Sequence, residues 1–266
     1  MIDEVMIKSQ LNTSWAGKNL CCYEEIDSTN REIIRLAQEG APHGTLAVAE
    51  SQNAGRGRLG RTWISPAAAG IWMSLLLRPH MAPQSASMIT LVAALAVVKG
   101  IRECTGLATG IKWPNDVVCE GKKICGILTE MSTDGTAIRY VVPGIGINVN
   151  MTEFPETVRE TAASLRMLLG EPVKREPLIA RIMEAFEDYY GRFLETEDFS
   201  VLKEEYNGFL ANCGRQVRVL DPKEPYQGTA LGIDSQGSLL VRTKDGQVRT
   251  VISGEVSVRG IYGYVL

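Results

Sequence analysis

Residues 54–63, which read AGRGRLGRTW, have the clearest chemical character of any stretch in the sequence. Arg56, Arg58 and Arg61 alternate there with small residues, and Trp63 follows as a surface on which a ring could stack. Guanidinium groups bind phosphate and carboxylate oxygens through two parallel hydrogen bonds. We therefore expect this loop to bind a phosphate or a carboxylate. The alternative is a turn whose arginines are simply solvated.

The same loop contains Gly55, Gly57 and Gly60 at the Gly-x-Gly-x-x-Gly spacing that opens a dinucleotide-binding Rossmann fold. That fold needs a helix beginning at the third glycine and an acidic residue about 20 residues further on. The sequence RTWISPAAAG follows instead, and no Asp or Glu occurs within residues 51–102. We conclude that the glycine spacing is a coincidence.

Three further stretches, IKWPNDVV, KKICGIL and PGIGINVN, carry the other candidate groups. Lys112 precedes a proline turn at which Asn115 and Asp116 place an amide beside a carboxylate. Lys123 stands at the start of a predicted strand, where a lone amine could bind a carboxylate, and Asn148 ends a glycine-rich strand that a ligand could approach closely. Each also has an ordinary structural alternative, such as a turn or a solvated hairpin lysine.

The composition points to a soluble globular enzyme. Of the 266 residues, 45% are hydrophobic and 22% charged, and the net charge of −3 gives no general reason to expect nucleic-acid binding. The N-terminus lacks the apolar run of a signal peptide, and residues 88–98, the longest apolar stretch, are too short to span a bilayer. We expect a cytoplasmic protein with no membrane partner.

The cysteines do not predict a metal site. Six cysteines form no Cys-x-x-Cys pair and lie far in sequence from His43 and His80, the two histidines. Zinc is therefore not expected, the thiols are interpreted as free, and any metal ligands stay unassigned.

Periodicity and turn residues predict the elements that position these groups. One helix should begin with a capping box of Thr29 and Glu32 and end at Gly40, and a buried helix should occupy residues 86–104. The other expected elements are strands over 45–51 and 71–77, hairpin turns at 120–122 and 134–135, and helices over 176–194 and 199–210.

The C-terminal part has a different character. After Cys213 the sequence consists of short β segments separated by Gly, Pro and Asp, which predicts a small barrel. We expect a boundary near Asn212, with residues 1–212 and 213–266 forming two domains.

Taken in order, these stretches resemble the biotin protein ligases. The matching blocks are IDSTN, ESQNAGRGRLGRTW, KWPNDV, KKICGILTE, GIGINVN, GIDSQGSLLV and SGEVSVR, and they cover nearly all of the chain after Tyr23. The resemblance implies an α+β catalytic domain of the class II synthetase type, with a mixed, mainly antiparallel sheet and helices. An SH3-like β-barrel would follow.

The resemblance also implies a reaction and its residues. Biotin and ATP, with Mg²⁺, would form biotinyl-5′-AMP, and a lysine of biotin carboxyl carrier protein would then attack it. The residues implied for biotin are Ser28, Thr29, Asn30, Gln52, Arg56, Gly57, Arg58 and Lys123. Those implied for the nucleotide are Arg58, Arg61, Trp63, Asn115, Asp116 and Asn148. Those implied for catalysis are Lys123, Arg58, Lys112 and Asp116.

Several alternatives stay open. Some biotin protein ligases carry an N-terminal DNA-binding module and act as biotin-operon repressors, but about twenty residues precede CYEEIDSTN here, so we expect a monofunctional ligase without DNA binding. The catalytic part of such a repressor is the alternative. A lipoate or octanoyl ligase would need an arginine-serine-glycine-glycine loop, which is absent. Lys123, Asn115 and Asp116 argue against an inactive biotin sensor, and a homodimer is left open.

Overall fold

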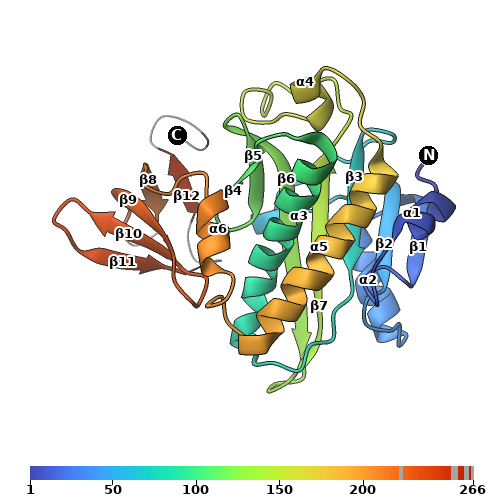
Figure 1. Cartoon of the computed structure of the whole chain (residues 1–266), viewed down its shortest axis with the longest axis horizontal. Coiled ribbons are helices and arrows are strands. Elements are labelled where there is room, and N and C mark those ends of the chain that lie inside the picture. The colour runs from blue at the N-terminus through green and yellow to red at the C-terminus, as the bar shows by residue number, and fades with distance from the viewer. Residues whose placement is uncertain (222–223, 253–256, 261–263, 265–266) are drawn as a thin grey trace.

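A large mixed sheet organises the molecule. The computed structural model describes residues 1–221, 224–252 and 264 and the backbone of residues 257–260. The large sheet has the order β1-β2-β3-β7-β6-β5-β4 (Figure 1), in which only β1 and β2 are parallel neighbours among the described strands. Its strands are β1 (Leu20–Ile26), β2 (Leu46–Gln52), β3 (Gly70–Leu75), β4 (Gly110–Lys112), β5 (Asp116–Cys119), β6 (Lys122–Thr133) and β7 (Ile138–Asn148). The predicted mixed, mainly antiparallel sheet is confirmed.

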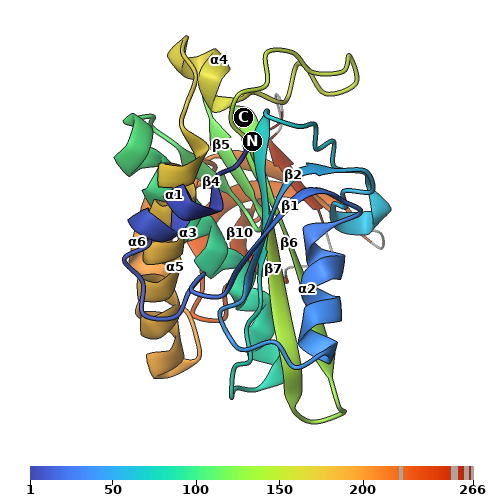
Figure 2. The ribbon, with the colours of Figure 1, turned by 90° about the vertical axis from the view of Figure 1, so that its right-hand side faces the viewer.

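Helices cover both faces of this sheet, with α3 and α5 on one side and α2 on the other (Figure 2). The buried α3 (Ile89–Thr105) packs against α5 (Arg175–Thr196), and Gly100 permits the close approach because a Cβ there would lie 2.6 Å from Cγ1 of Ile182. The shorter helices are α1 (Glu4–Gln10), α2 (Thr29–Gln38), η1 (Arg58–Gly60), η2 (Pro83–Met88), α4 (Leu165–Leu169) and α6 (Lys203–Phe209).

Among the described residues, one helical stretch, Pro83–Thr105, has the length and composition of a membrane span. In its most apolar window 78% of the residues are buried inside the protein. This stretch is therefore a core helix, whose apolar surface is covered by the sheet and by α5.

Two tight hairpins bring the candidate residues of β5, β6 and β7 together. Glu120 and Gly121 have φ values of 50° and 74°, as a two-residue turn between β5 and β6 requires. A second turn at Asp134 and Gly135 joins β6 to β7, whose register places Gly126 opposite Gly146. Both turns agree with the sequence prediction.

Two helix starts differ from the prediction. The capping box is wrong: Ser28 occupies the N-cap position, and the side chain of Gln52 accepts the hydrogen bond from the Thr29 amide. Glu32 instead accepts from Tyr23 and Arg35.

The second difference is at α6, which begins four residues later than predicted. The amide of Phe199 donates to the carbonyl of Ser235, so Phe199 belongs to the turn before the helix. A contact 36 residues distant in sequence therefore overrides the local helical pattern.

The C-terminal strands form a separate small antiparallel sheet with the order β11-β10-β9-β8-β12. It packs on the main part through Trp113, whose Nε1 donates to the carbonyl of Gly237 at 3.0 Å. The strands are β8 (Gln216–Leu220), β9 (Tyr226–Ile233), β10 (Leu239–Thr243), β11 (Val248–Val251) and β12 (Ser257–Gly260). The exact boundary near Asn212 stays a prediction.

Candidate active site

Two connected depressions lie on the α2 side of the large sheet. We call the first, of about 470 Å³, the inner hollow and the second, of about 1680 Å³ with its open mouth, the outer groove. The residues lining both depressions are Gly57, Arg58, Trp63, Asn115 and Lys123. They form what we call the junction.

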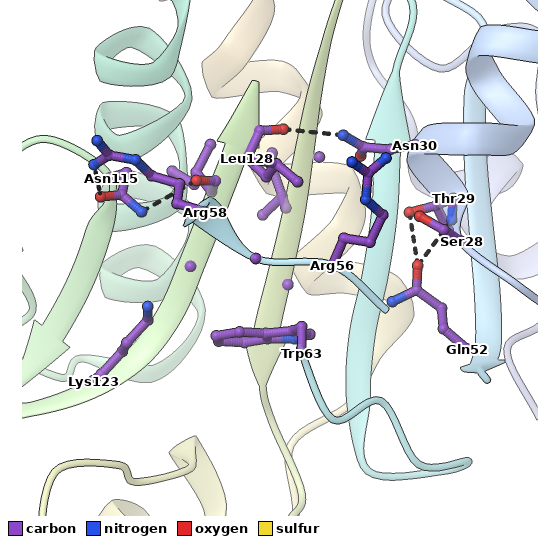
Figure 3. A pocket seen from close by; sticks show the side chains of 16 residues that line it. Ser28, Thr29, Asn30, Gln52, Arg56, Arg58, Trp63, Asn115, Lys123 and Leu128 are labelled. Carbon is purple, nitrogen blue, oxygen red and sulfur yellow. Dashed lines mark hydrogen bonds between the residues drawn. The ribbon is translucent and has the colours of Figure 1, made fainter. Parts of the chain in front are cut away.

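The N-terminus of α2 forms one wall of the inner hollow (Figure 3). Oε1 of Gln52 accepts hydrogen bonds from the Thr29 amide at 2.8 Å and from its hydroxyl at 3.2 Å, and Nε2 of Gln52 donates to Ser65 at 2.8 Å. The buried Ser28 hydroxyl makes no hydrogen bond to the described part of the chain, so it is available to a ligand. This wall presents neutral polar groups, most of them held in place by neighbouring side chains.

Asn30 lies at the back of the same wall, and both polar atoms of its side chain form hydrogen bonds with other protein groups. Its Nδ2 donates to the carbonyl of Leu128 at 3.2 Å and to Glu130 at 2.8 Å, while its Oδ1 lies 2.6 Å from the hydroxyl of Ser74. A Cβ on Gly144 would stand 1.8 Å from this Oδ1, so only glycine fits there. Asn30 therefore lines the hollow while acting as part of its frame.

Trp63 covers the floor between the two depressions. Its indole lies over the paired Gly126 and Gly146, where a Cβ would come within 2.9 and 2.5 Å of the ring. The ammonium of Lys123 stands 5.1 Å from the ring centroid. The buried Nε1 of Trp63 has no hydrogen-bond partner among the described residues. The two glycines thus provide a flat surface for a ring system.

A charged cluster connects the junction with the outer groove. Oδ1 of Asp116 lies 2.5 Å from the Nζ of Lys123, and Oδ2 lies 3.8 Å from the Nζ of Lys112. Asn115 links this cluster to the loop, because its Oδ1 accepts from Arg58 at 2.7 Å and its Nδ2 donates to Asp116 at 3.1 Å. Two lysines and one arginine thus surround a single carboxylate, which leaves a net positive charge.

The three loop arginines have different surroundings. Arg58 is part of the junction. Burial lowers the pKa of its guanidinium, which nevertheless stays protonated. Arg56 lines the inner hollow and forms an ion pair with Glu130 at 3.1 Å, whereas Arg61 is exposed beside the outer groove. The three arginines therefore do not share one environment. No α-helix begins at Gly60, in agreement with the rejected Rossmann interpretation.

Every residue selected from the sequence lines one of the two depressions. Asn148 and Lys112 are buried at the outer groove, where Nδ2 of Asn148 donates to the carbonyl of Ala163. The residues lining the inner hollow are Ser28, Thr29, Asn30, Gln52, Arg56, Gly57, Arg58, Trp63, Asn115 and Lys123, and the outer groove adds Arg61, Lys112, Asp116 and Asn148.

Sequence reasoning missed several members of the site. Glu130 binds Arg56 and Asn30 although it lies 74 and 100 residues away from them in sequence. Tyr264, near the C-terminus, lines the outer groove. Glu130 ends the block KKICGILTE, but nothing in that block points to Arg56 or Asn30, and Tyr264 lies in none of the matching blocks. Only the folded chain brings these two residues to the site.

Comparisons with known proteins identify the family of the chain. Residues 23–148 match the Biotin/lipoate A/B protein ligase family, and residues 213–259 match the Biotin protein ligase C terminal domain. The bifunctional ligase/repressor BirA of Bacillus subtilis is 39% identical over 259 residues, which cover 97% of this chain and 79% of that protein. The biotin–[acetyl-CoA-carboxylase] ligase of Mycobacterium tuberculosis is 33% identical and covers 96% of this chain and 95% of its own.

A solved structure matches the same extent of the chain. The biotin protein ligase from Aquifex aeolicus in complex with biotin and ATP has a TM-score of 0.80 and 32% identity. The match covers 91% of this chain and 99% of that one. Similarity in sequence and fold over nearly the full length shows that the chain belongs to the biotin protein ligase family.

Proposed function

We propose that the junction is where this biotin protein ligase joins biotin to ATP. The enzyme activates biotin as biotinyl-5′-AMP, with release of pyrophosphate, and then transfers the biotinyl group to a protein. The single observation that carries the assignment of the site is that Arg58 and Lys123 line both depressions. A carboxylate and an α-phosphate repel each other, so they require fixed cations at the point where they meet.

Biotin would occupy the inner hollow. Its ring system is neutral, which suits the polar groups of Ser28, Thr29 and Gln52. Asn30 supports this wall, because its amide is already bonded to Leu128, Glu130 and Ser74. The carboxylate would then reach the junction and exchange for Asp116 at the ammonium of Lys123.

ATP would occupy the outer groove. The cations of Arg58, Arg61 and Lys112 face this space, and Asn115 and Asn148 add amide groups. The segment after Asn150 contributes Met151, Phe154, Thr157 and Val158 to its rim. Loops around a reactive adenylate protect it from water, and we assign that task to this segment and to the arginine loop.

Mg²⁺ is proposed as a companion of the triphosphate. The only acidic side chain among the described lining residues is that of Asp116, and no group of three His, Cys, Asp or Glu residues gathers anywhere in the described part of the chain. This donor set fits an ion that takes most of its oxygens from phosphates and water, as Mg²⁺ does. When bound, the ion would neutralise charge on the phosphates.

The second half-reaction transfers biotin to a lysine of a biotin carboxyl carrier protein. The amine nitrogen attacks the acyl carbon, the bond from that carbon to the phosphate oxygen breaks, and AMP leaves. One proton must leave the amine, and Asp116 is the carboxylate placed to accept it. We propose the cytoplasm, where ATP and carrier are available, as the site of this reaction.

The experiment that tests the function is biotin-dependent exchange between pyrophosphate and ATP, with biotinyl-AMP identified by mass spectrometry. We expect exchange with biotin and none with lipoate, followed by labelling of a carboxylase carrier domain. Equal exchange with lipoate would contradict the assignment of biotin as the specific substrate. Absence of exchange with both acids would show that the protein does not catalyse the activation step. The name of the Bacillus relative also includes repression. That is a separate property, which is measured by binding to operator DNA.

A further inference from the structure

Tyr264 lines the outer groove and contacts the charged cluster there. Its hydroxyl donates to Oδ2 of Asp116, 148 residues away in sequence, and its ring lies 4.1 Å from the Nζ of Lys112. Tyr264 lines the outer groove but is absent from the residues lining the inner hollow. One side chain therefore contacts two members of the charged cluster on the nucleotide side only.

The two oxygens of Asp116 have different partners as a result. Oδ1 binds Lys123 at 2.5 Å and Asn115 at 3.1 Å, whereas Oδ2 receives the phenol of Tyr264 and stands 3.8 Å from Lys112. The side chains of Asp116 and Lys112 are each 9% exposed, so water has little access to either. A donor on Oδ2 keeps the carboxylate plane fixed and keeps Oδ1 directed at Lys123.

The phenol has a second property that a cation in its place would lack. It satisfies the carboxylate without adding charge, and the face of its ring attracts the Lys112 ammonium. Lys112 is therefore held beside Asp116 while its charge stays directed toward the groove.

We propose that Tyr264 is a positioning residue for the adenylation step. It fixes Asp116 and Lys112, so this one side chain completes the nucleotide side of the active site. This inference rests on the proposed function of the junction. It predicts that loss of Tyr264 impairs reaction with ATP and leaves binding of biotin alone intact.

The test compares Tyr264→Phe, which keeps the ring, with Tyr264→Ala, which removes ring and hydroxyl. Tyr226 offers a matched control, because it lies on β9 with Arg249 at 4.8 Å from its ring and lines neither depression. In biotin-dependent exchange we expect Tyr264→Phe to lower kcat by about tenfold, the loss of one hydrogen bond to a charged group. Tyr264→Ala should in addition raise the KM for ATP. Biotin affinity and the melting temperature should match those of the Tyr226 variants.

A double-mutant cycle separates positioning from a general structural role. If Tyr264 acts through Asp116, Tyr264→Phe should have no further effect on single-turnover adenylate formation in an Asp116→Ala background. An equal effect in both backgrounds would overturn the proposal, as would parental kcat in Tyr264→Phe, or biotin affinity that falls together with ATP turnover. Absence of exchange in the parent would overturn the proposed function and this inference with it. Normal exchange in both parent and variant would overturn this inference alone.

Discussion

The inner hollow and the outer groove solve different recognition problems with neighbouring residues. The inner hollow is walled by the N-terminus of α2 and strands of the large sheet, and Thr29, Asn30 and Gln52 are fixed by hydrogen bonds before any ligand arrives. The outer groove has cations that compete for one carboxylate and a rim with exposed apolar residues, such as Leu59 at 73% exposure. A neutral ring can be recognised by a rigid template, whereas anions need charges that rearrange when they bind.

This difference also has an energetic side. A polar group that is already oriented costs little to organise when a ligand binds. At the junction, by contrast, Lys123 must exchange the carboxylate of Asp116 for that of the substrate. The inner hollow should therefore tolerate few changes in shape, and the junction few changes in charge.

The largest effect is expected for Lys123→Ala, which changes charge where both depressions meet. Loss of a charge-assisted bond to carboxylate costs about 1.5–3 kcal/mol, so adenylate formation should fall by roughly 10- to 100-fold. Lys122→Ala, the preceding residue on β6, lines neither depression and is the matched control. Calorimetry should show weaker biotin binding in Lys123→Ala than in Lys122→Ala. Unchanged biotin affinity in Lys123→Ala would show that this lysine does not bind the biotin carboxylate.

A change of shape in the inner hollow should come next. Gly144→Ala places a Cβ 1.8 Å from Oδ1 of Asn30 and must displace that side chain from Ser74. We expect a loss of stability of about 1–3 kcal/mol and biotin binding weakened about tenfold, with ATP affinity retained. Gly191→Ala on α5, where a Cβ meets nothing within 4 Å, is the control. Unaltered biotin binding in Gly144→Ala would show that the hollow is not a rigid template.

Arg58→Gly should weaken the binding of biotinyl-AMP without unfolding the protein. Arg58 is half-buried and bonded to Asn115, so its loss should raise the adenylate dissociation rate by about tenfold. Released adenylate would label lysines of bystander proteins, which a blot for biotin detects. Arg215→Gly removes an exposed arginine from a bend before β8 that lines neither depression, and it serves as the control. Equal bystander labelling by both variants would make Arg58 an ordinary surface residue.

The smallest effect is expected for Arg56→Gln. Its ion pair with Glu130 is partly exposed, and such pairs contribute only about 0–1 kcal/mol. Stability should therefore change by about 1 kcal/mol or less and adenylate retention by about fivefold or less. The Arg58→Gly variant, assayed beside it, sets the scale. A loss in Arg56→Gln as large as that in Arg58→Gly would show that the two arginines contribute equally to binding of the adenylate.

The sequence predicted the parts of this molecule that depend on local patterns. The buried α3 and the turns at Glu120 and Asp134 follow from periodicity and turn residues, whereas the mainly antiparallel sheet was implied by the family resemblance, and all are present. The selection of Lys123 and Arg58 depended on local motifs together with the family resemblance, and both line the two depressions.

The failures share a physical cause, which is long-range contact. The cap of α2 is provided by Gln52, the start of α6 by Ser235, and the partner of Arg56 by Glu130. No propensity or spacing encodes pairs so distant along the chain. Tyr264 is the extreme case, since its partner Asp116 lies 148 residues away in sequence.

The buried indole N–H of Trp63 has a consequence for how ligands stabilise the enzyme. A buried donor without a partner destabilises the folded state by about 1–3 kcal/mol. A ligand oxygen that accepts this hydrogen bond removes that penalty, and the gain adds to the ligand's own contacts. Because of thermodynamic linkage, the melting temperature of the protein is then a sensitive measure of whether a ligand is bound beside Trp63, which lies over Gly126 and Gly146.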